Sequence, residues 1–415
     1  MNKDKHIPQG YKESSLGIIP KEWEVKRLGD CTELLTNGFV GVATPHYTED
    51  NDGITYIQGF NVIEGGFNLT GIKKVTKAFH EKNKKSSLLE DDLLTIQTGD
   101  IGLTTMVPKE LEGSNCHALI ISRFKRIIIP RFMLYYYNSS IGRNRFRVIE
   151  TGTTMKHLNT GDLYKFLIPV PSISEQESII RIIQLWDTAI EKQSELIEKL
   201  TLRKRALMQK LLTGKKRLPG FCAKWTKMKL GDIAEIVGGG TPNTNEPQYW
   251  DGDILWFTPS EIGKTKYVSK SERTISKEGL VNSSAKKLPI GTILFTSRAT
   301  IGAKAILEKE ATTNQGFQSI IVSNGNSNEF LYYYIDILLN TIKQKASGST
   351  FSEVSANSLR NLTIKMPEIE EQVQIASILI DSDKEIELAN AKLAKLKSQK
   401  RGLMQQLLTG KKRIK

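Results

Sequence analysis

The residue types in this chain best suited to direct chemistry are basic and hydroxyl side chains placed just after short apolar runs. Residues 297–300 (SRAT) follow the apolar run Ile293–Phe295 and precede an Ile-Gly pair. A strand should therefore deliver Arg298 into a tight loop. An arginine fork matches the two hydrogen-bond acceptors on the guanine edge, so Arg298 is a candidate base reader. A structural ion pair between Arg298 and a carboxylate is the alternative.

Similar candidates occur elsewhere in the chain. Thr98, with Gln97 beside it, takes the place of Arg298 when residues 93–102 (LLTIQTGDIG) are laid on 293–302 (ILFTSRATIG). Turns near 152–156 and 348–350 offer hydroxyls and amides to phosphates, although plain turns explain them equally well. A solvated face is the alternative for the lysines at 73–77. The candidate DNA contacts are Lys73, Lys74, Lys77, Gln97, Thr98, Thr154, Lys156, Ser297, Arg298, Thr300, Ser349 and Thr350.

Catalytic signatures are missing where they would be expected. No Pro-Pro pair occurs, whereas adenine methyltransferases hold the extruded base with an Asn/Asp-Pro-Pro-aromatic stretch. The Gly-Lys-Thr at 263–265 lacks the earlier glycine of a phosphate loop, and prolines follow the glycines at 238–240. Cys116-His117 has no second pair at metal-ligand spacing. We therefore predict a chain with no catalytic residues, no metal site and no cofactor of its own.

Composition favours a globular protein with an anionic partner. Hydrophobic residues make up 39% and charged residues 25% of 415 residues, and the net charge is +14. A surplus of this size attracts polyanions, nucleic acid first. No apolar run is long enough to cross a membrane, and the polar start is not a secretory signal. Three scattered cysteines fit a reducing compartment, so we expect a cytoplasmic protein.

The positioning elements form an internal duplication. LMQKLLTGKKR at 207–217 returns as LMQQLLTGKKR at 403–413, and 403 − 207 gives an offset of 196. WEVKRLGD at 23–30 likewise returns as WTKMKLGD at 225–232. Leu134–Tyr137 (LYYY) matches Leu331–Tyr334, and residues 131–146 read as one short helix after a proline. The divergent stretches between these anchors should be loops.

Two long helices should precede the LLTGKKR sequences. Heptad positions from 179 to 211 and from 375 to 407 carry the same seam, with a lysine at 204 and 400 in both copies. Acidic residues fill the first half of each helix and basic residues the second, so antiparallel pairing sets opposite charges together. Solvation of single helices is the alternative. The residues predicted for helix pairing, to which the family resemblance described below adds subunit docking, are Ile183, Trp186, Ile190, Ile197, Leu200, Leu379, Ile386, Leu393 and Leu396.

These patterns predict an α+β fold with two globular domains of twisted mixed sheets. The domains would be joined by two long antiparallel coiled-coil helices, with a pseudo-two-fold internal repeat. The expected parts are an arm at 1–19, a first globular domain at 20–171, a long helix at 172–217, a second globular domain at 218–367 and a long helix at 368–415.

The repeated residues resemble a known family. WEVKRLGD and WTKMKLGD, the ATIG and TNQGF stretches at 299–302 and 313–317, the Pro-x₃-Glu-Gln helix starts and the LLTGKKR ends resemble specificity subunits of type I restriction–modification systems. Residues 114–117 (SNCH) depart from the second copy, which has NQGF at 314–317. The resemblance implies two target recognition domains, two spacer helices and no catalysis in this subunit.

The implied role is binding of double-stranded DNA at a bipartite, asymmetric target. Each domain would read one half, and the helices would set the gap and dock two modification (methyltransferase) subunits. Restriction (endonuclease and translocase) subunits would join that complex. S-adenosylmethionine, ATP and magnesium would belong to these partners. The alternative is a non-enzymatic coiled-coil adaptor that links two protein-binding domains.

Overall fold

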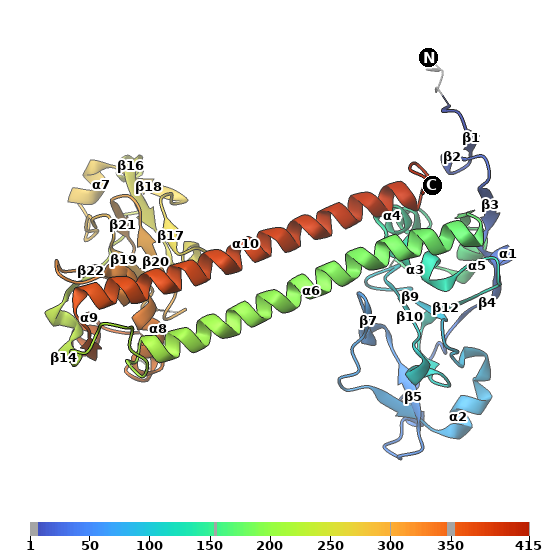
Figure 1. The fold of residues 1–415 in the computed structure, drawn as a ribbon, viewed down its shortest axis with the longest axis horizontal. Coiled ribbons are helices and arrows are strands. Elements are labelled where there is room, and N and C mark those ends of the chain that lie inside the picture. Colours follow the sequence, from blue (N-terminus) through green and yellow to red (C-terminus); the bar gives the residue numbers. More distant parts are fainter. Residues whose placement is uncertain (1–6, 153–155, 299, 347–352, 415) are drawn as a thin grey trace. The chain divides into compact units, whose positions relative to one another are not determined.

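The computed structural model describes residues 7–152, 156–298, 300–346 and 353–414. The chain divides into two compact units. Unit 1 comprises residues 1–194 and 391–415, and unit 2 comprises residues 195–390. Each unit therefore takes part of each long helix. Figure 1 shows both helices unbroken, in green and red.

Unit 1 is built on a four-stranded antiparallel sheet in the order β10-β9-β12-β4. Its strands are Thr104–Met106, Leu93–Ile96, Leu119–Phe124 and Thr32–Asn37. A second sheet has the order β11-β5-β8, in which β11 runs parallel to β5. These strands are Asn115–Cys116, Ile54–Ile57 and Lys73–Val75. The short apolar runs of the sequence thus pair into mixed sheets.

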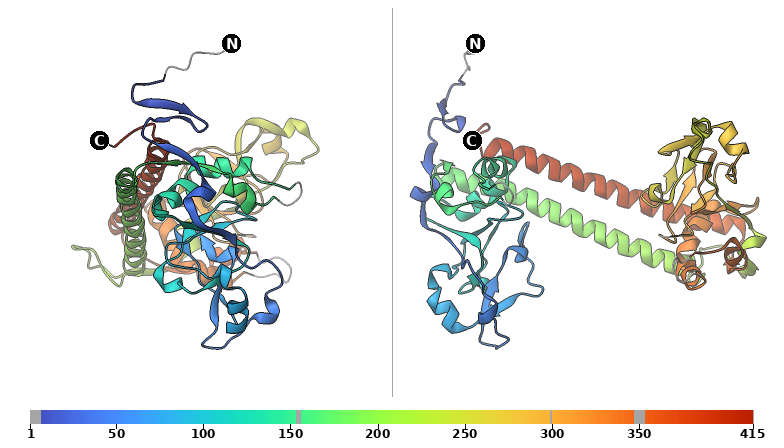
Figure 2. Two further views of the ribbon diagram at one scale, coloured as in Figure 1. Left: turned by 90° about the vertical axis from the view of Figure 1, so that its right-hand side faces the viewer. Right: turned by 180° about the vertical axis from the view of Figure 1, so that it is seen from behind.

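Two-stranded pairs and short helices complete unit 1. The strand pairs are β1 (Tyr11–Ser14) with β2 (Gly17–Pro20), β3 (Glu24–Arg27) with β13 (Leu167–Val170), and β6 (Val62–Ile63) with β7 (Gly66–Phe67). The short helices are α1 (Leu28–Cys31), α2 (Lys77–Lys82), α3 (Pro130–Asn138), α4 (Ser140–Val148) and α5 (Thr160–Tyr164). Both views of Figure 2 place the β1–β2 hairpin near the C-terminal end of the chain, where the Tyr11 hydroxyl donates to the Lys411 carbonyl at 3.3 Å.

Unit 2 repeats this order of elements. Its larger sheet runs β15-β22-β19-β20-β17, and β17 is parallel to β20. These strands are Ala234–Gly238, Gln318–Val322, Ile293–Phe295, Lys304–Leu307 and Tyr267–Val268. A β18-β16-β21 sheet and a β14-β23 pair follow, with strands Arg273–Ile275, Trp250–Phe257, Ala311–Thr313, Thr226–Lys229 and Thr363–Met366. The helices are α7 (Lys277–Val281), α8 (Asn328–Gln344) and α9 (Ala356–Arg360).

The two long helices are α6 (Ile173–Leu211) and α10 (Ile369–Leu407), each of 39 residues. At about 1.5 Å per residue, each is roughly 58 Å long. None of the predicted seam positions on either helix is exposed, and Ile183 and Leu379 are fully buried. In unit 1 the start of α6 and the end of α10 join one core with Trp23 and α3. In unit 2 the end of α6 and the start of α10 join the core around α8.

Two local predictions were wrong. Residues 131–146 do not form one helix, because Ser139 ends α3 and its hydroxyl accepts from the Gly142 amide to begin α4. Matching LYYY at 134–137 with 331–334 is also wrong by one residue. Tyr135 donates to Asp187 in unit 1, whereas Tyr333, not Tyr332, makes the equivalent bond to Asp383 in unit 2. The contacts with the long helices show that Tyr135 corresponds to Tyr333, although the matching of identical residues had paired Tyr135 with Tyr332.

Candidate nucleic-acid interface and helix anchors

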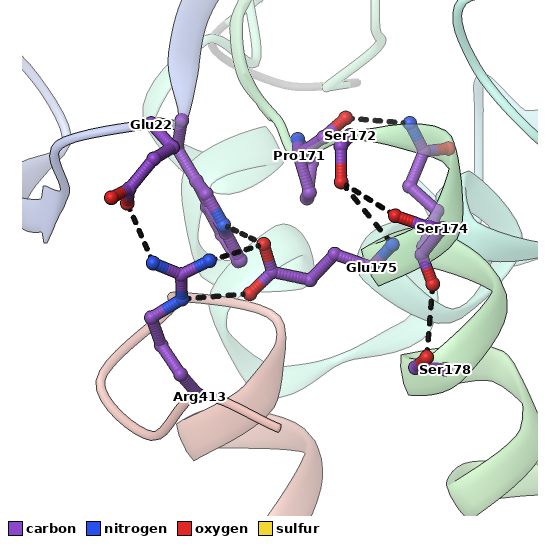
Figure 3. Close-up of polar contacts among 9 residues, drawn as sticks. Glu22, Pro171, Ser172, Ser174, Glu175, Ser178 and Arg413 are labelled. Atoms are coloured by element: carbon purple, nitrogen blue, oxygen red, sulfur yellow. Dashed lines mark hydrogen bonds and ion pairs between the residues drawn. The ribbon is translucent and has the colours of Figure 1, made fainter. Parts of the chain in front are cut away.

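A largely covered carboxylate holds the start of α6 in unit 1. Glu175 is in the first turn, and its Oε2 accepts from the Trp23 indole at 3.0 Å. The Arg413 guanidinium donates to both oxygens of Glu175 at 3.1 Å and to Glu22 at 2.6 Å. Figure 3 shows Arg413 between the two carboxylates. The tryptophan of WEVKRLGD and the arginine of LLTGKKR therefore meet at one helix start.

Unit 2 has the same anchor at the start of α10. Trp225 donates to Glu371 at 3.1 Å, and Arg217 donates to both Glu371 oxygens at 2.7 Å. The Glu371 side chain is only 1% exposed. These hydrogen bonds raise the pKa of the Arg217 guanidinium above its usual value. The arginines at 217 and 413 are both paired with carboxylates of the chain, although Arg413 stays partly exposed, and the neighbouring lysines at 215, 216, 411 and 412 are exposed.

The lysines that interrupt the heptad seam have partners in both units. In unit 1, Lys400 pairs with Asp187, which also accepts from the Tyr135 hydroxyl at 2.7 Å. In unit 2, Lys204 pairs with Asp383, which accepts from Tyr333 at 2.5 Å. Burial, reinforced by the aspartate, raises the pKa of both tyrosines, so each remains a donor. Within each unit, a position farther along α6 pairs with a position that comes earlier in the C-terminal segment, as antiparallel helices require.

The glycine of each LLTGKKR sequence caps a helix. Gly214 and Gly410 take positive φ values of +68° and +69°. The Lys216 amide donates back to Lys210 at 3.0 Å, and the Lys412 amide donates back to Gln406 at 3.2 Å. The Gly214 and Gly410 amides also donate back three residues, to the Leu211 and Leu407 carbonyls, both at 3.1 Å, so each helix ends at a glycine in the left-handed conformation.

In unit 1 the loop after β9 lies against the segment before α5. Thr98 and His157 form an antiparallel bridge, and the Leu158 amide donates to the Gln97 carbonyl at 2.9 Å. Thr98, Lys156 and His157 are exposed, while Leu158 is buried. The structure thus brings three predicted contacts together, namely Gln97, Thr98 and Lys156. Lys156 also lies 3.6 Å from Glu150 in an ion pair.

Unit 2 presents the same pair of segments. Arg298 bridges Glu353, and the Val354 amide donates to the Ser297 carbonyl at 3.0 Å. The Arg298 Nε lies 2.9 Å from Glu353 Oε1, and both side chains are partly exposed, at 45% and 37%. The structure therefore contains the ion pair that the sequence analysis gave as the alternative role of Arg298. Thr300 is exposed.

Glycines close both loops. Gly102 and Gly302 have φ values of +81° and +104°. A Cβ at Gly102 would stand 2.5 Å from Phe146, and one at Gly302 would stand 2.3 Å from Leu339. Only glycine fits such a backbone at such close approach. The repeated Ile-Gly pairs therefore fix the shape of the two loops that follow β9 and β19.

The other predicted contacts fall in three places. Ser297 is fully buried and its hydroxyl donates to the Gly316 carbonyl at 3.2 Å, so Ser297 is a structural residue and its prediction as a DNA contact is corrected. Lys73, Lys74 and Lys77 lie on β8 and α2, where Lys77 pairs with Asp52 at 2.7 Å. The third group lies outside the described residues: Thr154, Ser349 and Thr350.

The comparison with known families decides which kind of protein carries these loops. The model of the type I restriction modification DNA specificity domain matches residues 20–202 and 223–398. The chain belongs to this family. The two matched ranges cover both copies of the repeat, and the family resemblance seen in the sequence is confirmed.

Individual relatives agree with the family. The chain is 41% identical over 167 residues to the specificity subunit of the MjaIX type I restriction enzyme of Methanocaldococcus jannaschii, a match that covers 39% of either chain. It is 24% identical to the putative MjaX specificity subunit of that organism over 98% of this chain and 97% of the relative. Among solved structures, the HsdS subunit from Thermoanaerobacter tengcongensis shares the fold with a TM-score of 0.55 at 18% identity, over 94% of this chain and 98% of that one.

For this member of the specificity family, the described residues offer no group of three or more His, Cys, Asp and Glu side chains that could hold a metal ion. None of its helices, within the described ranges, is both long and apolar enough to cross a membrane.

Sequence reasoning missed the residues that face the predicted loops. His157 and Glu353 lie about 55 to 60 positions from their partners, so no local pattern joins them. A signal was nonetheless present, since 157 and 353 differ by the same offset of 196 as the LLTGKKR copies. The aspartates at 187 and 383 could have been found in the same way.

Proposed function

We propose that this chain is the DNA-binding specificity subunit of a type I restriction–modification complex. The observation that carries the proposal is the equivalent placement of two exposed loop pairs, one in each unit. Unit 1 presents Thr98 beside His157, and unit 2 presents Arg298 beside Glu353. The frames are alike and the exposed side chains differ. Two readers of this kind suit a bipartite target whose halves have different sequences.

The long helices are proposed as the spacer between the readers. The ion pairs in unit 1 join 187 with 400 and 175 with 413, and those in unit 2 join 204 with 383 and 217 with 371. The positions in each pair add to 587 or 588, which is one antiparallel register. We therefore propose a continuous antiparallel coiled coil, in which the repeat has pseudo-two-fold symmetry. Such a ruler would set the gap between two half-sites.

The remaining roles are assigned to partner subunits. We propose that two methyltransferase subunits dock on the spacer helices and that restriction subunits join the complex. The chain itself is proposed to be non-catalytic, and S-adenosylmethionine, ATP and magnesium would belong to those partners. The proposed divisions are an arm at 1–19, readers at 20–171 and 218–367, and spacers at 172–217 and 368–415.

A salt titration tests the DNA-binding proposal. The complex of this chain with its methyltransferase subunits is titrated with target DNA at 50, 100 and 200 mM salt. If six phosphates are neutralised, affinity should fall roughly a thousandfold across this range, because each neutralised phosphate releases counterions. Affinity that does not change with salt would contradict the proposal. It would favour the adaptor alternative, in which the units bind proteins.

A further inference from the structure

Each unit holds a second residue opposite its predicted DNA contact, namely the exposed His157 in unit 1 and the partly exposed Glu353 in unit 2. The α5 and α9 segments are equivalent, since the Leu158 amide in unit 1 and the Val354 amide in unit 2 make the same bond to the loop before them. His157 precedes Leu158 and forms a backbone β-bridge with Thr98. Glu353 precedes Val354 and forms the same bridge with Arg298. In such a bridge the two Cβ atoms are roughly 5 Å apart, on the same face. The two side chains therefore present one joint surface.

The buried and loop-closing residues around these pairs are similar in the two units, whereas the residues of the pairs themselves differ. Leu158 and Val354 are both buried apolar residues, and Gly102 and Gly302 close both loops at positive φ. Within that frame, unit 1 has threonine and histidine where unit 2 has arginine and glutamate. Buried positions that agree in the two copies maintain the fold. Exposed positions that differ on an unchanged frame are where the copies can recognise different partners.

In unit 2 the Glu353 carboxylate restrains the Arg298 side chain. The carboxylate engages Nε at 2.9 Å. This contact is an ion pair without hydrogen-bond geometry, and within the described ranges the two terminal Nη groups make no hydrogen bond either. A guanidinium held through Nε presents its terminal fork end-on, which is an arrangement that fits the O6 and N7 acceptors of guanine. Holding the fork in place also lowers the entropy lost on binding.

We propose that the facing pairs Thr98–His157 and Arg298–Glu353 are the specificity-determining sites of the two units. Glu353 is the positioning residue for Arg298, and His157 shares the reading surface of unit 1 with Thr98. This inference rests on the proposed DNA-binding function and deepens it. It predicts that a change at 157 and a change at 353 alter different halves of the target.

The test uses the complex of the full chain with its methyltransferase subunits and a DNA pool randomised across the target. Bound DNA is sequenced, and base preference is measured at each position. Glu353→Ala should lower the preference at one or two positions of one half-site by about tenfold, which is within the discrimination of a good bidentate contact. His157→Ala should alter preferences in the other half-site only. Glu353→Gln keeps an acceptor for Nε and should retain most of the wild-type preference.

Glu310→Ala is the matched control for Glu353→Ala. Glu310 pairs with Lys287 at 2.6 Å, and both side chains are about half exposed, but Glu310 follows the Leu307 end of β20, whereas the loop after β19 joins its Lys304 end. This variant should keep every base preference. The inference is overturned if Glu353→Ala and His157→Ala retain all preferences, if both alter the same half-site, or if affinity falls equally for all sequences. A wild-type complex that shows no base preference would refute the DNA-binding function itself.

Discussion

At the scale of the residue, Arg298 tests whether unit 2 reads bases. Arg298→Ala removes a guanidinium that is partly exposed and held by Glu353. We expect base discrimination to fall by about 1–3 kcal/mol at one position of one half-site, because a bidentate contact to guanine is lost. Competition binding with single-base variants of the target measures this loss. Weakening that is equal for all sequences would make Arg298 a phosphate contact.

A second residue-scale prediction concerns a buried lysine in unit 2. The Lys304 side chain is 7% exposed and pairs with Asp336 at 2.5 Å. Burial lowers the pKa of Lys304, and Asp336 opposes that change. Asp336→Asn removes this compensation, so it should lower the free energy of unfolding by about 1–2 kcal/mol at neutral pH, a value reduced because Asp336 is partly exposed.

The pH dependence of this variant has a definite sign. The pKa of Lys304 in the folded chain lies below its ordinary value of 10.5, and loss of Asp336, which raises this pKa, lowers it further. The folded variant therefore releases this proton at a lower pH than the folded wild type, while both unfolded chains titrate alike. The loss of stability should therefore shrink as the pH rises towards 10.5. Urea unfolding at pH 7 and pH 9.5 measures it. The control is the double variant Lys304→Thr/Asp336→Asn, which copies the neutral Thr104–Asn138 pair of unit 1. Equal losses at both pH values would contradict the account.

Some residue-scale features could be predicted and others could not. The lysines at 204 and 400 stood out because they interrupt an apolar period. Their aspartate and tyrosine partners come from other elements, so only packing identifies them. Ser297 shows the opposite error. It follows a strand and resembles a loop residue, yet the bond to Gly316 draws it into the core.

At the scale of the element, the helices were the most predictable part of the fold. Heptad spacing and the capping glycines fixed their seam and their ends, because both signals are local. The segment 131–146 was less predictable. A serine such as Ser139 can lie within a helix or at the N-cap of a new one. In this chain its hydroxyl accepts from the Gly142 amide, so it is the N-cap of α4. The register of the LYYY sequences also depended on contacts with α6 and α10.

The spacer proposal makes an element-scale prediction. Deleting residues 191–197 together with 391–397 removes one heptad from each helix and preserves the antiparallel register. Each helix becomes shorter by about 10 Å at 1.5 Å per residue. The gap in the target should therefore shrink by about three base pairs at 3.4 Å each, while both half-site sequences remain.

Selection from randomised DNA by the shortened chain with its methyltransferase subunits measures the gap. The control deletes 191–197 alone, which puts the two helices out of register by one heptad and should impair binding or folding. A half-site sequence that changed in the matched deletion would show that the helices read DNA and do not only space the readers.

At the scale of the whole molecule, the duplication explains why one chain carries two similar sites. The anchors at Glu175 and Glu371, the capping glycines and the loop-closing glycines occur once in each unit. The sequence revealed this organisation because repeated scaffold residues keep their spacing. It could not reveal which bases are read, because that depends on how loops from distant segments meet.

The central claim is that the chain gives its complex a bipartite target with two different halves. The most direct measurement maps methylated bases across the DNA of cells that carry this chain with its partner subunits. We predict methylation within one motif of two specific, non-identical half-sites separated by a fixed non-specific gap, and its loss when the chain is deleted. A continuous or palindromic motif, or methylation that persists without the chain, would contradict the account.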